Sequence, residues 1–243
     1  MIKIQNLHKS FDSNPVLCGV SLDIFPDEIF VVVGKSGVGK SVLLKTIIGL
    51  IKPDRGSIFV DNKEITRMNR KELFEIRKKF GMLFQSAALF DSMTVKENLS
   101  LALKEHTGLP SDEIRKRAAG KLELVGLEDI LDKYPAELSG GMKKRVGLAR
   151  ALMMEPEYIL FDEPTTGLDP VMARSIDRLI YETTQKAGIT SVIVTHDMIT
   201  AVTIGTRIAM LEQGKIIFDG TPEKFLKCRE KAVQEFINSI KNI

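Results

Sequence analysis

Hydrophobic and polar residues alternate over the first 25 positions of the chain, as in Ile2-Lys3-Ile4-Gln5. A period of two is typical of strands that bury one face. The segment Asp12-Ser13-Asn14-Pro15 is rich in turn-forming residues and predicts a turn between two antiparallel strands. The later segment Ile29-Phe30-Val31-Val32-Val33 is apolar at every position, which indicates a strand buried on both faces.

Helical periodicity dominates the middle of the chain, from about Ser86 to Ala151. An earlier helical segment, from about Gly39 to Gly49, follows a glycine-rich turn. Polar residues that precede apolar-periodic segments predict three helix starts. These residues are Thr94, Ser111 and Ser139.

Strand-like runs return at residues 158–161, 191–194, 208–211 and 215–218, and Gln213-Gly214 predicts a hairpin between the last two. From Pro222 onward the pattern predicts two short helices. Because strands alternate with helices, the expected fold class is α/β. We expect one domain over residues 1–221, with a helical insertion at about 86–151, followed by a short helical tail at 222–243.

Composition excludes several classes of protein. The chain has 243 residues, of which 44% are hydrophobic and 28% charged, a globular balance that argues against disorder. Its net charge of +3 is too small to indicate a nucleic-acid partner. Cys18 and Cys228 stand far apart without metal-like spacing, which favours a reducing compartment. The most apolar stretch, 191–211, contains His196, Asp197 and Arg207, so no membrane span is expected.

The segment Gly34-Lys35-Ser36-Gly37-Val38-Gly39-Lys40-Ser41 fits the phosphate-binding Walker A pattern. Its glycines let backbone N–H groups point at phosphate oxygens, and the following helix adds its positive dipole end. Lys40 is expected to reach the β- and γ-phosphates, and Ser41 to bind Mg²⁺. The alternative is a glycine turn that only begins a helix. The buried strand before it and the helix after it favour phosphate binding.

Asp162 and Glu163 end the apolar run 158–161, where the carboxyl end of a central strand faces the ligand crevice of an α/β sheet. Asp162 suits a Mg²⁺ ligand through water, and Glu163 suits a base for the attacking water. Alone, such a pair is usually a solvated strand end. Together with the Walker A segment it indicates a Mg²⁺-dependent nucleoside triphosphatase.

The segment Leu138-Ser139-Gly140-Gly141-Met142 closely resembles the signature sequence of ABC-type ATPases. Ser139 suits a helix N-cap, and the two glycines leave amide groups exposed at the positive helix end. The resemblance implies an ABC-type P-loop NTPase with a RecA-like mixed-sheet core, an N-terminal antiparallel β subdomain and an inserted helical subdomain. It also implies a head-to-tail homodimer in which each signature caps the ATP of the other subunit.

Other positions resemble the family in order along the chain. Phe11 resembles the aromatic residue that stacks on adenine, Gln85 occupies the Q-loop position, and His196 occupies that of the switch histidine. Residues 164–169 resemble the D-loop, whereas Val42 replaces a threonine of many relatives. The expected nucleotide-binding residues are Phe11, Gly34, Lys35, Ser36, Gly37, Val38, Gly39, Lys40, Ser41, Val42, Ser139, Gly140, Gly141 and Asp169. The expected catalytic residues are Glu163, His196, Gln85 and Lys40, and the expected Mg²⁺ ligands are Ser41, Gln85 and Asp162.

The continuation Met142-Lys143-Lys144-Arg145 and the segment 84–99 resemble the Mla or Mce-associated lipid transporters. This resemblance implies a peripheral ATPase subunit at the cytoplasmic face of the inner membrane, with ATP and Mg²⁺ as cofactors. Its expected partners are integral membrane permease subunits and a Mce-domain lipid-binding protein, with no nucleic acid and only indirect membrane contact. The apolar run 87–90 is expected to line the permease groove, with plain core as the alternative. The basic clusters 77–79, 115–117 and 143–145 are expected to be solvated helix faces, with a position near anionic lipid headgroups as the alternative.

Two other functions stay open. One is an ABC ATPase that drives a small-molecule importer or exporter, with the same site chemistry and a different permease. The other is a soluble ABC ATPase that works without any permease.

Overall fold

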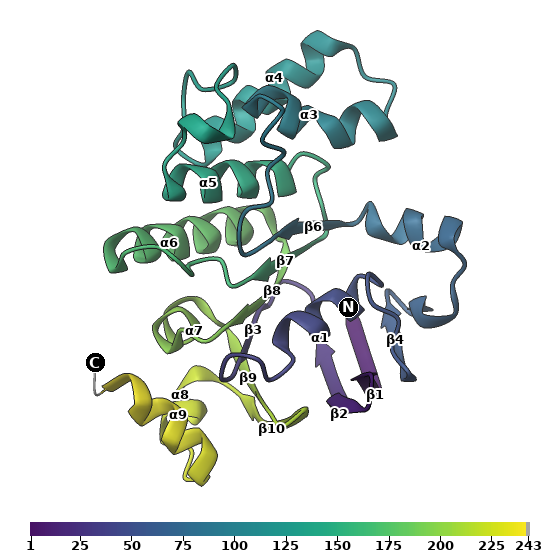
Figure 1. Ribbon diagram of the computed structural model, residues 1–243, viewed down its shortest axis with the longest axis vertical. Helices are drawn as coiled ribbons and strands as arrows, with labels where there is room; N and C mark the ends of the chain where they lie inside the picture. The colour runs from purple at the N-terminus through teal and green to yellow at the C-terminus, as the bar shows by residue number, and fades with distance from the viewer. Residues whose placement is uncertain (242–243) are drawn as a thin grey trace. The chain divides into compact units, whose positions relative to one another are not determined.

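The computed structural model describes residues 1–241, and the chain divides into two compact units (Figure 1). The first unit comprises residues 1–77 and the described residues from 190 onward. The second comprises residues 78–189. Within residues 1–241, no helix combines the length and the apolar character that crossing a bilayer requires.

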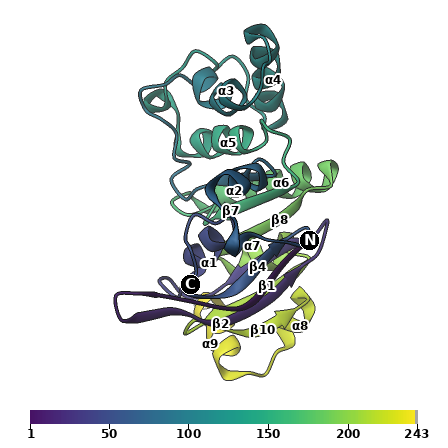
Figure 2. The same ribbon diagram turned by 90° about the vertical axis from the view of Figure 1, so that its right-hand side faces the viewer.

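An antiparallel sheet in the order β2-β1-β4-β5 forms part of the first unit, and β1, β2 and β4 can be followed in Figure 2. Its strands are β1 (Ile2–Phe11), β2 (Asn14–Ile24), β4 (Arg55–Val60) and β5 (Lys63–Glu64). Ile2 and Ile4 are buried and Lys3 is exposed, which confirms the alternation expected at the start of the chain. The predicted turn is too long, because Asn14 already pairs with Phe11 in the sheet.

A second group of strands in the first unit has the order β10-β9-β3-β8. The buried strand β3 (Ile29–Val33) pairs in parallel with β8 (Thr190–Thr195) and β9 (Arg207–Glu212). The predicted hairpin is confirmed, because β10 (Lys215–Gly220) pairs antiparallel with β9. The helices of this unit are α1 (Lys40–Ile47), α2 (Arg70–Arg77), α7 (Met198–Ile204), α8 (Pro222–Lys227), α9 (Lys231–Lys241) and the short 3₁₀ helix η1 (Ile65–Arg67).

In the second unit, β6 (Phe80–Leu83) pairs in parallel with β7 (Tyr158–Asp162). Its helices are α3 (Val95–His106), α4 (Ser111–Leu124), α5 (Gly140–Ala151), α6 (Pro170–Ala187) and the 3₁₀ helix η2 (Pro135–Glu137). Thr94 and Ser139 are N-caps as predicted, and Thr94 forms a complete capping box with Glu97. The start predicted at Ser111 is also confirmed, because Ser111 is the first helical residue of α4, after an N-cap at Pro110.

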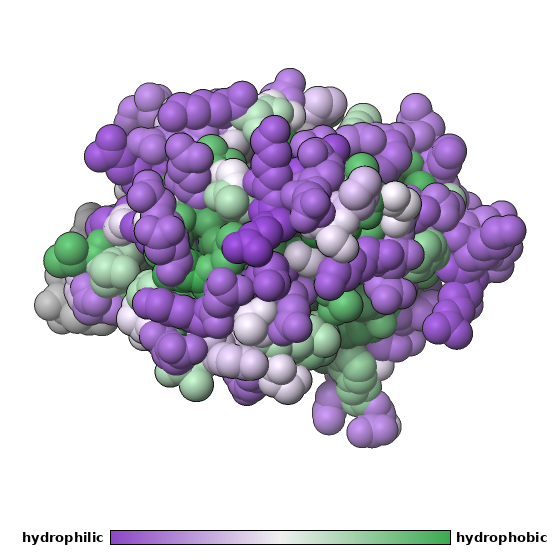
Figure 3. All heavy atoms as spheres, turned by 90° about the horizontal axis from the view of Figure 1, so that it is seen from above, coloured by the Kyte–Doolittle hydropathy of each residue, from purple (hydrophilic) through white to green (hydrophobic). Residues whose placement is uncertain are grey.

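The face seen from above Figure 1 is mostly hydrophilic, with hydrophobic atoms recessed between polar side chains (Figure 3). Charged residues also supply much of the surface of α4, where only Ile114, Ala118 and Leu122 are buried. Their spacing of four residues gives one narrow apolar stripe. The helix therefore packs through one face and leaves the other to solvent.

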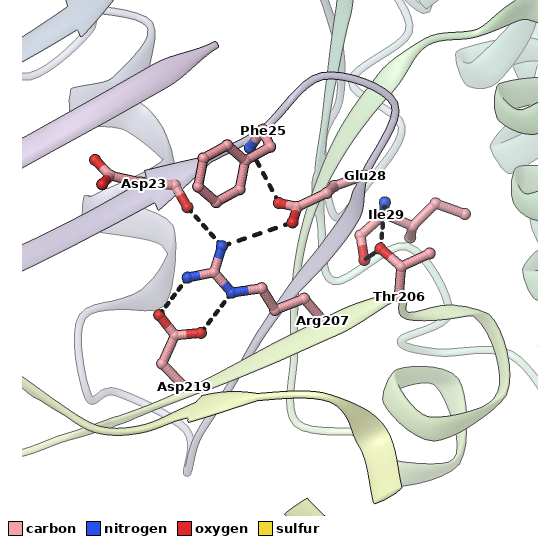
Figure 4. Close-up of polar contacts among 7 residues, drawn as sticks. All are labelled: Asp23, Phe25, Glu28, Ile29, Thr206, Arg207 and Asp219. Atoms are coloured by element: carbon pink, nitrogen blue, oxygen red, sulfur yellow. Dashed lines mark hydrogen bonds and ion pairs between the residues drawn. The ribbon is translucent and has the colours of Figure 1, made fainter. Parts of the chain in front are cut away.

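One guanidinium joins four segments of the first unit (Figure 4). Arg207 of β9 donates to both carboxylate oxygens of Asp219 on β10 at 2.6 Å and to the main-chain oxygen of Asp23 on β2 at 2.9 Å. It also pairs with Glu28 at 3.6 Å, just before β3, and Glu28 accepts from the main-chain N–H of Phe25. The bond to Asp219 raises the pKa of Arg207 above its ordinary value. The arrangement fixes the start of β3 against β2 and the hairpin.

We expect Arg207→Ala to lower the free energy of unfolding by about 2 kcal/mol, because it removes charge-assisted hydrogen bonds to partly buried partners. Urea unfolding measures this loss. Arg178→Ala is the matched control, since Arg178 is exposed on α6 and pairs with Glu182 of the same helix. Equal losses in the two variants would contradict the role given to Arg207.

Candidate functional site

Two sequence-predicted segments of the first unit emerge at the same edge of its parallel strands. Val33 of β3 and Thr195 of β8 are register partners, and each strand ends at that residue. The loop that begins at Gly34 and the exposed His196 therefore leave neighbouring strands at their carboxyl ends. This is where α/β sheets bind ligands.

The loop between β3 and α1 wraps around its own lysine. Lys40 is buried, and its Nζ donates to the main-chain oxygens of Gly34 at 2.8 Å and Lys35 at 3.0 Å. Gly39 is the N-cap of α1 at φ 107°, a conformation that other residues rarely adopt, and no side chain caps the helix. Backbone N–H groups at this end are thus available to an anion.

The remaining predicted binding residues of the first unit differ in exposure. Lys35, Ser36 and Gly37 are exposed, whereas Val38, Ser41 and Val42 are partly buried. Phe11 ends β1 with 44% of its surface exposed, and the Lys9 ammonium lies 5.3 Å from its ring centroid. Phe11 is therefore a surface aromatic rather than part of the core.

The second unit brings Gln85, Asp162 and Glu163 to one edge. Leu83 of β6 and Phe161 of β7 are register partners, and the three residues follow them closely along the chain. Asp162 and Glu163 are buried, whereas Gln85 is exposed. Glu163 has a left-handed backbone at φ 49°, and its carboxylate accepts from the Thr166 hydroxyl at 3.1 Å.

The role of Lys144 is not evident from the sequence. The cluster 143–145 was expected to be solvated, but Lys144 is buried and its Nζ donates to the main-chain oxygens of Gln85 and Glu163. Burial lowers the pKa of Lys144, while the charges of Glu163 and Asp162 act in the opposite direction. Helical spacing did contain a signal, because position 144 shares a face with Gly141 and Leu148, both buried.

The signature and D-loop residues of the second unit begin helices. Ser139 is the N-cap of α5, where its Oγ accepts from the N–H of Met142 at 3.2 Å. Gly140 is exposed and Gly141 is buried. Asp169 caps α6 by accepting from two main-chain N–H groups at 3.0 Å each. Each of these helix starts presents N–H groups at a positive dipole end.

A groove of about 600 Å³ opens beside β6, between the loop that follows it, α3 and the end of α5. Ala88 and Phe90 of the expected apolar run line it, whereas Ala87 is buried. The lining is mainly apolar, with a few charged side chains among it. Its residues are Phe80, Gly81, Met82, Phe84, Ala88, Phe90, Asn98, Leu101, Ala102, Glu105, His106, Arg150, Ala151 and Met154.

The oxygen-bearing residues expected around a metal suit Mg²⁺. Ser41 offers a hydroxyl, Asp162 a carboxylate and Gln85 an amide oxygen, which are hard donors of the kind that Mg²⁺ prefers. Among residues 1–241, no cluster of three or more His, Cys, Asp or Glu side chains could form a metal cage. Mg²⁺ does not need such a cage, because it usually keeps waters and binds substrate phosphates with one or two protein ligands.

The family model, the similar proteins and the similar solved structures all indicate one family. The family model described as ABC transporter matches residues 17–166. The chain is 44% identical over 237 residues to the probable ribonucleotide transport ATP-binding protein mkl of Mycobacterium leprae, which covers 98% of this chain and 68% of that protein. It is 43% identical to the methionine import ATP-binding protein MetN of Carboxydothermus hydrogenoformans, over 99% of this chain and 72% of that one.

A relative named for lipid transport is also similar. The intermembrane phospholipid transport system ATP-binding protein MlaF of Haemophilus influenzae is 37% identical, over 98% of this chain and 90% of that one. Among solved structures, the ATP-binding cassette MJ0796, a dimer in a post-hydrolysis state bound to ADP and phosphate, superposes with a TM-score of 0.85 at 34% identity. That match covers 91% of this chain and 99% of the other. The fold class predicted from the sequence is thereby confirmed, and the chain belongs to the ABC transporter family as an ATP-hydrolysing subunit.

Proposed function

We propose that this chain couples ATP-driven closure of a homodimer to the movement of phospholipid between membranes through a partner permease. The observation that carries the lipid assignment is the sequence that follows the signature, Met142-Lys143-Lys144-Arg145. The similarity to the phospholipid transport protein over nearly the whole of both chains supports it. The ATPase subunit is peripheral at the cytoplasmic face of the inner membrane.

The first unit binds the nucleotide. Lys40 contacts the β- and γ-phosphates, and the uncapped N-terminus of α1 donates its N–H groups to the same anion. Phe11 stacks on adenine, for which its exposed ring is suited. Ser41 of the first unit and Gln85 and Asp162 of the second would each offer Mg²⁺ an oxygen ligand, and the ion would supply electrostatic stabilisation of the charge on the transferring phosphoryl group.

The second unit supplies the base for hydrolysis. Glu163 accepts a proton from the attacking water as the water oxygen bonds to the γ-phosphorus. The bond from that phosphorus to the oxygen bridging to the β-phosphate breaks, so ADP and phosphate leave. The Thr166 hydroxyl holds the Glu163 carboxylate in one orientation. Gln85 orients the same water, and His196 of the first unit contacts the γ-phosphate. Each of these assignments follows the family motif that the residue matches.

Two copies of the chain form a head-to-tail dimer. In it, Ser139, Gly140, Gly141 and Asp169 of one protomer meet the nucleotide of the partner. The exposed start of α5 suits this role, because its N–H groups and dipole attract a phosphate. The similar solved cassette is itself a dimer bound to ADP and phosphate.

The groove beside β6 receives the permease. Its apolar lining suits a short amphipathic helix, and its position next to Gln85 links the partner to the loop that senses nucleotide. A Mce-domain lipid-binding protein completes the proposed assembly. Membrane contact of the ATPase is indirect, through the permease.

A small-molecule transporter is the second candidate. The relatives named for ribonucleotide transport and methionine import are 44% and 43% identical, which is more than the phospholipid transport protein. Such a transporter would use the same site residues of this chain with a different permease, and the permease would decide the substrate. A soluble ATPase without a permease is the third.

Glu163→Gln tests the base. We expect this variant to bind ATP with wild-type affinity and to lose about 100-fold or more in turnover, because an amide cannot accept the proton. Steady-state hydrolysis and nucleotide titration measure the two effects, and size-exclusion chromatography with ATP should show a trapped dimer. Glu123→Gln on the exposed face of α4 is the control. Wild-type hydrolysis by Glu163→Gln would refute the assignment.

Affinity capture from detergent-solubilised membranes tests the assembly and the groove together. The wild-type chain should recover a permease with a Mce-domain protein, whereas recovery of a different permease would replace the lipid assignment. A chain found only in the soluble fraction would refute the transporter role.

Ala102→Arg places a long cation in the groove and should reduce permease recovery about tenfold while ATP binding is unchanged. Ala119→Arg, an exposed position on α4 outside this groove, is the matched control. Full recovery with Ala102→Arg would mean that the permease binds elsewhere.

A further inference from the structure

Lys144 connects the two loops of the second unit that carry Gln85 and Glu163. It lies in the middle of α5 with 6% of its surface exposed. Its ammonium donates to the main-chain oxygen of Gln85 and, at 3.4 Å, to the main-chain oxygen of Glu163. One loop follows β6 and the other follows β7. A single side chain from a third element therefore bridges both.

Packing alone does not account for a cation at this position. Burying an ammonium is unfavourable unless hydrogen bonds and opposite charges compensate for lost water. Burial does lower the pKa of Lys144, and the nearby charges of Glu163 and Asp162 oppose that effect. An apolar side chain of similar size would fill the same space without this penalty. The two accepting carbonyls and the two nearby carboxylates therefore compensate the buried charge together, and the carbonyls are what ties it to the two loops.

Both of the loops that Lys144 connects contain strained backbone. Glu163 has a left-handed conformation, as do Ala87 and Ala88 in the loop after Gln85, at φ 61° and 47°. Non-glycine residues in this region need support from their surroundings, and they concentrate at functional sites. Removing the hydrogen bonds that support these residues would therefore let both loops relax to other backbone conformations.

A second cation of α5 supports the same loop. Arg150 donates to the main-chain oxygens of Ala87 at 2.6 Å and Ala88 at 2.7 Å, and it also lines the groove beside β6. Gly147, between the two cations, lets α5 approach, because a Cβ there would lie 3.2 Å from that of Ala87. The loop after β6 is therefore held by α5 at two places: by Arg150 beside the groove, and by Lys144 at Gln85, where the same ammonium also reaches Glu163.

We propose that Lys144 is a positioning residue that fixes the backbone of Glu163 to the Gln85 loop, so that a displacement of the loop at the groove changes the placement of the base. The proposal rests on the proposed role of Glu163. A movement that the permease causes at the groove would then reach Glu163 through main-chain hydrogen bonds within the second unit. Lys144 acts through Glu163 and does not itself touch the reacting atoms.

The test compares Lys144→Met, Lys144→Arg and wild type in the full chain as captured from membranes. Methionine keeps the volume and removes both hydrogen bonds, whereas arginine restores donors in the same place. We expect Lys144→Met to lower kcat about tenfold while the Kd for ATP and the Tm stay near wild-type values. Lys144→Arg should recover most of the lost kcat. Lys143→Met, the adjacent and less buried lysine, is the control and should keep wild-type turnover.

Each outcome decides the proposal. A wild-type kcat in Lys144→Met, equal losses in kcat and ATP affinity, or a Lys144→Arg variant as slow as Lys144→Met would overturn it. If Lys144→Met does not fold, Lys144→Gln decides, because its amide is one bond shorter and cannot span both carbonyls. A folded Lys144→Gln with wild-type ATP affinity should then have a kcat lowered about threefold, and an unchanged kcat would overturn the bridge.

Glu163→Gln, assayed in parallel, distinguishes failure of the proposed base from failure of the proposed positioning role of Lys144. Normal hydrolysis by that variant removes the role of Glu163 itself. Loss of hydrolysis in Glu163→Gln together with full activity in Lys144→Met refutes only the positioning role of Lys144.

Discussion

Main-chain hydrogen bonds between neighbouring parallel strands hold the candidate residues of each unit in place. In the first unit, the pairing of Val33 with Thr195 sets where the phosphate-binding loop and His196 begin. In the second, the pairing of Leu83 with Phe161 does the same for Gln85 and the carboxylates Asp162 and Glu163. A shift of one residue in either pair would turn every following side chain to the opposite face. The strands β3, β7 and β8 are buried throughout, which fixes that register.

Much of this fold is predictable from the sequence, because the decisive signals are local. Continuous apolar runs predict β3, β7 and β8, and the turn-forming pair Gln213-Gly214 predicts the hairpin of β9 and β10. Thr94 and Ser139 are N-caps whose side-chain oxygens satisfy backbone donors, so their positions follow from residue type. The elements not predicted lie between residues 55 and 83. There β6 has only four residues, one of them Gly81, and β4 begins with Arg55-Gly56, so neither shows a clear period.

The residues of the candidate site also fall into those that the sequence predicts and those that it does not. Motif spacing names residues whose chemistry is carried by their own type, such as Lys40, Ser41 and Asp162. It does not show that Lys144 is buried, because a run of three basic residues favours a solvated face when it is considered alone. Nor does it show the left-handed backbone of Ala87, Ala88 and Glu163, which depends on contacts from a helix more than fifty residues away from the first loop. Long-range contacts to main-chain atoms leave little trace in a single sequence.

The attachment of the Gln85 loop to α5 is made through carbonyl oxygens, and every amino acid has one. Lys144 and Arg150 therefore hold the course of the backbone without specifying which side chains the loop carries. Side chains at 88 and 90 line the groove, so a substitution at either position would alter the surface offered to the proposed permease and leave the connection to Glu163 in place. An attachment made through main-chain oxygens tolerates substitutions in the loop that an attachment made through the loop's own side chains would not.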